Sequence, residues 1–122
     1  AGYHSVTPYI IVRDAKAAIE FYTSAFGASE VLRLDGPEGK LAHAEIKIGD
    51  SHVMLADENP EFGAISPNTL GGTASSQLIY CEDVEAMFQQ ALAAGATEKR
   101  PLQDQFYGDR SGVVEDPFGH SW

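Results

Sequence analysis

The chain has 122 residues, enough for one compact domain or two small, tightly joined modules. Its 43% hydrophobic content allows a packed core, while 18 acidic against 8 basic residues give a formal net charge of −10. That balance excludes a basic surface for nucleic acid and disfavours anionic membrane surfaces. Because the sequence also shows no membrane-length apolar run and no secretory signal, we expect a cytoplasmic protein without a nucleic-acid or membrane partner.

The first half of the chain predicts a strand, a helix and three further strands. Residues 6–12 are apolar and rich in β-branched side chains, which is typical of a buried strand. Asp14 has the side chain of a helix N-cap, and Gly27 follows the last apolar helical position. The three predicted strands that follow are Glu30–Asp35, Leu41–Ile48 and His52–Ala56.

The second half repeats this order. Residues 77–81 predict a strand, Asp83 a helix N-cap and Gly95 a helix stop. Asp14 and Asp83 are 69 positions apart, and Gly27 and Gly95 are 68 apart. We therefore predict an α+β fold made of two tandem βαβββ modules. Residues 1–57 form the first module, 58–73 a linker rich in Pro and Gly, and 74–122 the second module, whose last strand is truncated.

Three motifs accompany this duplication: Asn-Pro-Glu-Phe-Gly at 59–63, Gln-Phe-Tyr-Gly-Asp-Arg-Ser-Gly at 105–112, and Glu-Asp-Pro-Phe-Gly-His-Ser-Trp at 115–122. Together they make the chain resemble the vicinal-oxygen-chelate superfamily (glyoxalase, bleomycin-resistance and dioxygenase proteins), and in particular its PhnB-like branch. The resemblance implies a U-shaped mixed sheet with helices on its convex side. It also implies a small-molecule cavity on the concave side and a homodimer.

The same resemblance implies where a metal would bind. Metal-dependent members take four ligands from the first and last strands of each module. The corresponding positions here are Thr7, Leu55 and Ser76, and the fourth falls beyond Trp122. None of the three is a typical ligand for a divalent cation, and a shift of one residue does not restore the site. We therefore expect no metal and no other cofactor, and leave open a divalent metal at a different site.

Histidine and glutamate side chains provide the other candidates for chemistry. His43 and Glu45 are two positions apart in a predicted strand, so they share one face. They are candidates for a general base or metal ligands, but the favoured interpretation is a solvated pair or a polar pocket wall. His52 and His120 occupy equivalent repeat positions after a turn, which favours a structural role such as a hydrogen bond to a turn carbonyl.

The expected ligand pocket combines residues of both modules. Its predicted members are Thr7, Tyr9, His43, Glu45, Leu55, Ser76, Tyr80, Tyr107 and Arg110. Arg110 either belongs to a charged turn or holds an anionic group of the ligand, and Tyr107 either packs or stacks on the ligand. The leading hypothesis is metal-free binding or sequestration of a small molecule. The alternatives are a metal-dependent lyase, isomerase or dioxygenase with a different site, and a non-catalytic interaction module, so enzymatic activity stays open.

Overall fold

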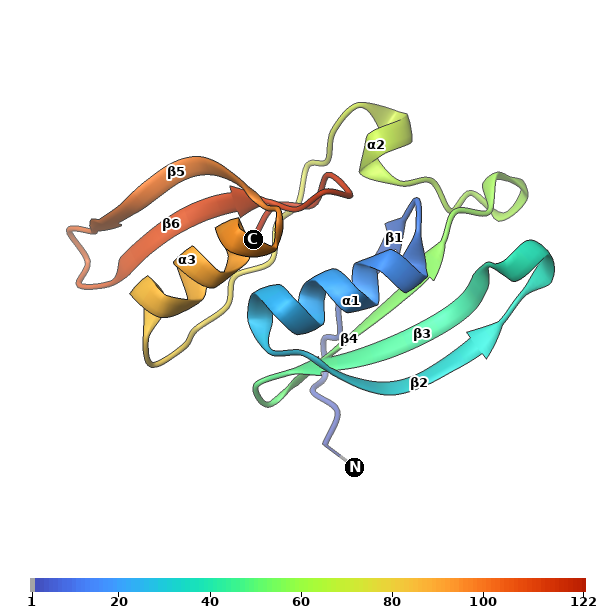
Figure 1. Ribbon diagram of the computed structural model, residues 1–122, viewed down its shortest axis with the longest axis horizontal. Helices are drawn as coiled ribbons and strands as arrows, with labels where there is room; N and C mark the ends of the chain where they lie inside the picture. Colours follow the sequence, from blue (N-terminus) through green and yellow to red (C-terminus); the bar gives the residue numbers. More distant parts are fainter. Residues whose placement is uncertain (1) are drawn as a thin grey trace.

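The computed structural model describes residues 2–122, which form two structural repeats that meet through their helices (Figure 1). The first repeat contains β1 (Tyr9–Val12), α1 (Ala15–Phe26), β2 (Ser29–Asp35), β3 (Leu41–Ile48) and β4 (Ser51–Asp57). The second contains α3 (Val84–Ala94), β5 (Thr97–Asp104) and β6 (Arg110–Glu115). A short helix, α2 (Pro67–Leu70), lies between them. The predicted α+β class is confirmed.

The first repeat forms a four-stranded mixed sheet in the order β1-β4-β3-β2. β1 runs parallel to β4, and the other neighbours are antiparallel. Alternate side chains point to opposite faces of a sheet. The face toward α1 is apolar and fully or almost fully buried, with Ile10, Ala44, Ile46 and Leu55 among its residues. The other face carries Tyr9, His43, Glu45 and Met54.

The helix ends confirm the repeated capping pattern. The carboxylate of Asp14 accepts a hydrogen bond from the backbone amide of Ala17 at 3.1 Å, and Asp83 does the same for Ala86 at 3.0 Å. These bonds satisfy amides that have no partner inside the helix. Gly27 then ends α1 with φ of 69°, a backbone conformation that glycine adopts without strain.

The second repeat has the same topology but a smaller sheet. Only β5 and β6 form a ladder, so the structure divides the expected sheet into a four-stranded and a two-stranded part. The strand predicted at 77–81 is wrong: Ser76 forms one parallel bridge with Ser121, which in turn forms an antiparallel bridge with Glu115. This order repeats that of β1, β4 and β3. A strand did not form because its neighbour here is Ser121 alone, whereas β1 pairs with the seven-residue β4.

Residues 58–73, predicted as the linker, are fixed to the first repeat. The carboxylate of Glu58 accepts hydrogen bonds from the hydroxyls of Ser66 and Thr69, the latter at 2.5 Å. Arg13 donates to the Thr69 hydroxyl at 3.1 Å. The connection between the repeats is therefore held against the β1–α1 junction.

Helices α1 and α3 pack together, and polar contacts add to this junction (Figure 1). Gln90 of α3 donates to the backbone carbonyl of Ala25 at 3.0 Å. The imidazole Nε2 of His120 lies 2.8 Å from the backbone oxygen of Ile11. Side chains of both repeats thus share one core. No helix within residues 2–122 is long and apolar enough to cross a membrane.

Candidate functional site

The open face of the first sheet brings together several of the predicted site residues. Tyr9 on β1 and His43 on β3 are joined by a hydrogen bond of 2.8 Å between the Tyr9 hydroxyl and His43 Nδ1. Burial raises the pKa of the Tyr9 hydroxyl, which therefore stays protonated at neutral pH. Glu45 lies on the same face, opposite Met54 in the β3–β4 register. The prediction that His43 and Glu45 share a face is confirmed.

Glu45, however, bonds to His52 and not to His43. Its carboxylate is only 2% exposed, and its Oε2 lies 2.5 Å from Nδ1 of His52 on β4. The ring of Tyr3 stacks on His52 with centroids 4.2 Å apart. A hydrogen bond to Glu45, with partial burial and the carboxylate charge, raises the pKa of the Tyr3 hydroxyl. Glu45 is therefore the centre of a cluster formed with His52 and Tyr3.

A cavity of about 730 Å³ lies between the two repeats. Thr7 and His52 line it from the first repeat, and Ser76, Tyr80 and Trp122 from the second. Three predicted pocket residues, Thr7, Ser76 and Tyr80, are thus brought together across the repeats. Sequence reasoning missed His52 and Trp122. The alternation of β3 and β4 carried a signal for His52. In the β3–β4 register His52 pairs with Lys47, and Lys47 lies two positions after Glu45. The side chain of His52 is therefore expected on the same face as that of Glu45.

Two other cavities are lined by further predicted pocket residues. One of about 340 Å³ lies over α3 and includes Tyr80 and Arg110 in its wall, with Met87 and Phe88 below. The other, of about 430 Å³, includes Tyr9. Of the predicted pocket residues, Thr7, Tyr9, Ser76, Tyr80 and Arg110 line these cavities. His43, Glu45, Leu55 and Tyr107 line none of the three.

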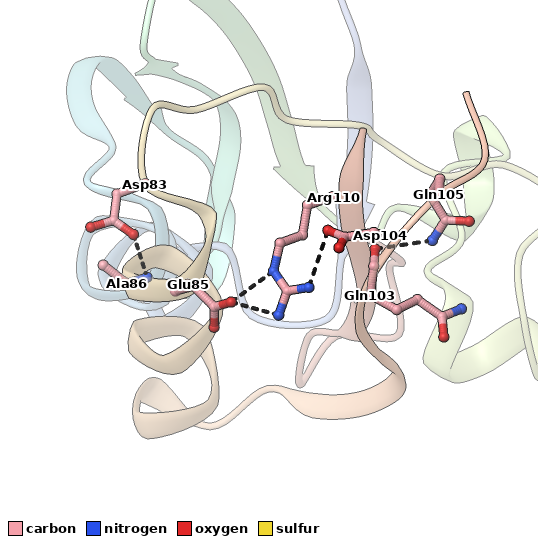
Figure 2. Close-up of polar contacts among 7 residues, drawn as sticks. All are labelled: Asp83, Glu85, Ala86, Gln103, Asp104, Gln105 and Arg110. Atoms are coloured by element: carbon pink, nitrogen blue, oxygen red, sulfur yellow. Dashed lines mark hydrogen bonds and ion pairs between the residues drawn. The ribbon is translucent and has the colours of Figure 1, made fainter. Parts of the chain in front are cut away.

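Arg110 is engaged by acidic neighbours (Figure 2). Its guanidinium lies 2.6 Å from Glu85 on α3 and 3.4 Å from Asp104 on β5. The hydrogen bond to Glu85 is the main cause that raises the pKa of Arg110. A ligand anion would have to compete with both carboxylates, so the structural role of Arg110 outweighs the anion-binding one.

Tyr107 lies outside the three cavities. It is 61% exposed, and its ring meets that of Phe106 edge to face at a centroid distance of 5.1 Å. The stacking of Tyr107 on a ligand would therefore need a partner surface beyond these cavities.

Leu55 is the pocket residue whose placement the structure corrects. It is fully buried on the α1 side of the sheet, where it pairs with Ile10 and Ala44. Met54 occupies the open face instead, between Tyr9 and Glu45 in the strand register. A shift of one residue along a strand moves a side chain to the opposite face, which explains the error.

The residues at the superfamily's metal positions do not fit a divalent cation. Thr7 offers a hydroxyl that hydrogen-bonds to the backbone oxygen of His4 at 3.3 Å, and Ser76 offers another hydroxyl. Met54 offers only a thioether, a soft ligand that hard cations avoid. Within the described part of the chain, no three His, Cys, Asp or Glu side chains are arranged to hold a metal ion. No step of chemistry is therefore assigned to a metal at these positions.

Comparisons with known proteins agree with this architecture. Residues 2–122 match the sequence model of the Glyoxalase/Bleomycin resistance protein/Dioxygenase superfamily. An uncharacterized protein of Mycobacterium bovis is 47% identical over 97% of this chain and 80% of its own length. The crystal structure of TioX from Micromonospora sp. ML1 superposes with a TM-score of 0.75 at 27% identity, covering 98% of this chain and 92% of that one. A PhnB protein from Bacillus cereus gives 0.70 at 26%, covering 98% and 96%.

Proposed function

The chain belongs to the Glyoxalase/Bleomycin resistance protein/Dioxygenase superfamily, and we propose that it binds a small organic molecule between its repeats without that superfamily's metal centre. The observation that carries the proposal is the cavity of about 730 Å³. Cavities that bind small molecules measure ~300–1,000 Å³ and combine apolar walls with a few polar groups.

The cavity walls have this mixed character. Leu78, Met87 and Trp122 provide apolar surface, while the hydroxyls of Thr7 and Ser76 provide hydrogen-bonding groups. The chain carries a formal net charge of −10, which attracts cations and repels anions at long range. We therefore expect a neutral or cationic ligand with an aromatic or aliphatic body.

Trp122 offers a direct test because it is the single tryptophan and lines the cavity. A panel of neutral and cationic aromatic molecules that includes p-nitroacetanilide is titrated while Trp122 fluorescence is recorded. We expect saturable quenching at one molecule per chain. Ser76→Phe, which fills the cavity, should weaken binding at least about tenfold, because a ring in the cavity excludes the ligand.

The matched control is Ser24→Phe, which adds the same ring at an exposed position of α1. It should bind the panel with unchanged affinity. Equal binding by Ser76→Phe and the natural protein would reject this cavity as the site.

The second candidate function is an enzyme, a lyase or isomerase with a site of its own. It is supported by the pairing of a buried carboxylate, Glu45, with His52 at the cavity wall. An interaction module without a ligand would instead need a cavity filled by side chains, and the space between the repeats counts against it.

Three finer properties belong to the same proposal. Similarity to the PhnB protein at 26% identity supports the PhnB-like branch. Exposed apolar side chains on the open face of the first sheet, among them Tyr9 and Leu34, support a homodimer, because such surface usually contacts a partner. The single cysteine, Cys81, has no second cysteine in this sequence to pair with, which supports a cytoplasmic location. Light scattering that gives twice the mass of the chain would establish the dimer.

A further inference from the structure

We propose that His52 is the acid–base group of the cavity between the repeats and that Glu45 is its positioning residue. This inference rests on the proposed ligand binding in that cavity. It names a group for which sequence reasoning expected only a structural role.

The first step concerns the two ring nitrogens of His52. Glu45 is an acceptor when ionised, so the 2.5 Å contact with Nδ1 places the proton on that nitrogen. The other nitrogen, Nε2, is then the one that can take a proton from a ligand. The carboxylate also stabilises the imidazolium that forms when Nε2 accepts the proton.

The second step concerns how firmly the ring is held. Glu45 is almost fully buried, and the His52 side chain is only 10% exposed. Tyr3 stacks on one face of the imidazole. Gly2 lies beside Nε2, since a methyl group at this position would be in ordinary van der Waals contact with that nitrogen at 3.8 Å. The ring therefore has one orientation, as an acid–base group requires.

The equivalent histidine of the second repeat shows what a structural role looks like. His120 uses Nε2 to bond the backbone oxygen of Ile11 at 2.8 Å, which joins the two repeats. Within residues 2–122, His52 makes no hydrogen bond to a backbone carbonyl. It bonds a carboxylate through Nδ1 and lines the larger cavity. The two histidines share a position in the repeat and differ in what surrounds them.

The chemistry that follows is proton abstraction. Nε2 of His52 takes a proton from a hydroxyl or an acidic C–H group of a neutral or cationic ligand, and the bonding electrons stay on the ligand. The imidazolium returns the proton to the ligand in the second half of the reaction. Proton balance is complete without an oxidant or a metal.

The test uses p-nitrophenyl acetate, a neutral ester that reports on an available imidazole. Nε2 attacks the acetyl carbon, p-nitrophenolate leaves, and water hydrolyses the acetyl-imidazole to acetate. We expect a rate of p-nitrophenolate release that saturates with ester concentration. His52→Gln should lower this rate at least about tenfold, and Glu45→Gln should lower the maximal rate about tenfold at an unchanged half-saturating concentration.

Lys47→Gln is the matched control, because Lys47 is the exposed register partner of His52. This variant should release p-nitrophenolate at a rate within about twofold of the natural protein's. Circular dichroism checks that each variant folds. Reaction of His52→Gln at the natural rate would overturn the acid–base role, and reaction of Glu45→Gln at the natural rate would overturn the positioning role. A His52-dependent rate that never saturates would support the pair while contradicting ligand binding. A saturating rate that does not depend on His52 would support ligand binding while contradicting the acid–base role of His52.

Discussion

At the scale of single residues, Asp116 joins distant parts of the chain. Its buried carboxylate accepts hydrogen bonds from the Tyr22 hydroxyl at 2.5 Å and from the Trp122 indole nitrogen at 2.8 Å. It also accepts from the backbone amides of Phe118 and His120. Burial, with the charge of Asp116, raises the pKa of Tyr22 well above its ordinary value. Asp116 thereby ties α1 of the first repeat to the end of the second.

Tyr22→Phe tests this contact while keeping the aromatic ring in the core. The variant removes one donor from a buried carboxylate, so we expect the free energy of unfolding to fall by about 1–3 kcal/mol. Urea denaturation measures the change. Tyr107→Phe removes the hydroxyl of an exposed tyrosine and should change stability by less than about 0.5 kcal/mol. Equal stability of Tyr22→Phe and the natural protein would show that Asp116 does not need this bond.

Glu58 predicts a pH dependence of stability. Hydrogen bonds from Ser66 and Thr69 lower its pKa below the ordinary value of 4.5. A folded-state pKa below the unfolded one stabilises the protein above pH 4.5, and this stabilisation is lost as the pH falls through the folded pKa. Glu58→Gln should therefore cost about 1 kcal/mol near neutral pH, since the site is partly solvated.

The cost of Glu58→Gln should shrink as unfolding is measured at successively lower pH below 4.5. Glu61→Gln removes an exposed carboxylate from the same connection and serves as the control. A cost that stays constant across this pH range would contradict the assigned role of Glu58.

Single residues were predictable from sequence where their partners are local. The caps Asp14 and Asp83 bond to amides three positions ahead, so a local pattern identified them. Glu45 and His52 come from adjacent strands, and Tyr22 and Asp116 from different repeats. Such pairs depend on strand register and on the packing of the repeats, which local patterns do not contain.

At the scale of elements, the packing of α3 on β6 depends on Gly112. A methyl group at this position would lie 2.7 Å from the ring of Phe88 on α3 and 3.0 Å from the backbone oxygen of Arg100 on β5. Real side-chain atoms do not approach so closely. The glycine therefore allows the helix to approach the two-stranded sheet.

Gly112→Ala should lower the free energy of unfolding by about 1–3 kcal/mol, because overpacking forces the helix away from the sheet. Thermal or urea unfolding measures the loss. Ser111→Ala changes the adjacent residue of β6 without adding volume and should have a small effect. If Gly112→Ala were as stable as the natural protein, the close approach of α3 to β6 would be wrong.

The elements were predicted well where alternation or capping marked both ends. Residues 41–48 form β3 as predicted, and β2 and β4 differ from prediction by one residue at their ends. β1 is shorter than predicted, beginning at Tyr9. The segment at 77–81 has the composition of a strand but lacks a partner along its length. A strand is a pairwise structure, so composition alone could not decide this case.

At the scale of the whole molecule, the duplication predicted the topology but not the cavity. Equivalent caps and glycine stops were enough to predict two repeats with the same order of elements. The cavity, however, lies where the segment around Thr7 meets the segment around Ser76, and its wall depends on how α1 packs against α3. Its members Thr7 and Ser76 were predicted from the resemblance, and strand alternation carried a signal for His52, whereas Trp122 required the packed molecule.

The most direct test of the account is a titration of Trp122 fluorescence with p-nitroacetanilide in the presence and absence of a metal chelator. Trp122 lies in the cavity wall, and the neighbouring Thr7 and Ser76 are poor ligands for a divalent metal. We predict saturable binding of one molecule per chain with the same affinity in both conditions. Loss of binding on chelation, together with one equivalent of metal in the untreated protein, would contradict a metal-free ligand site.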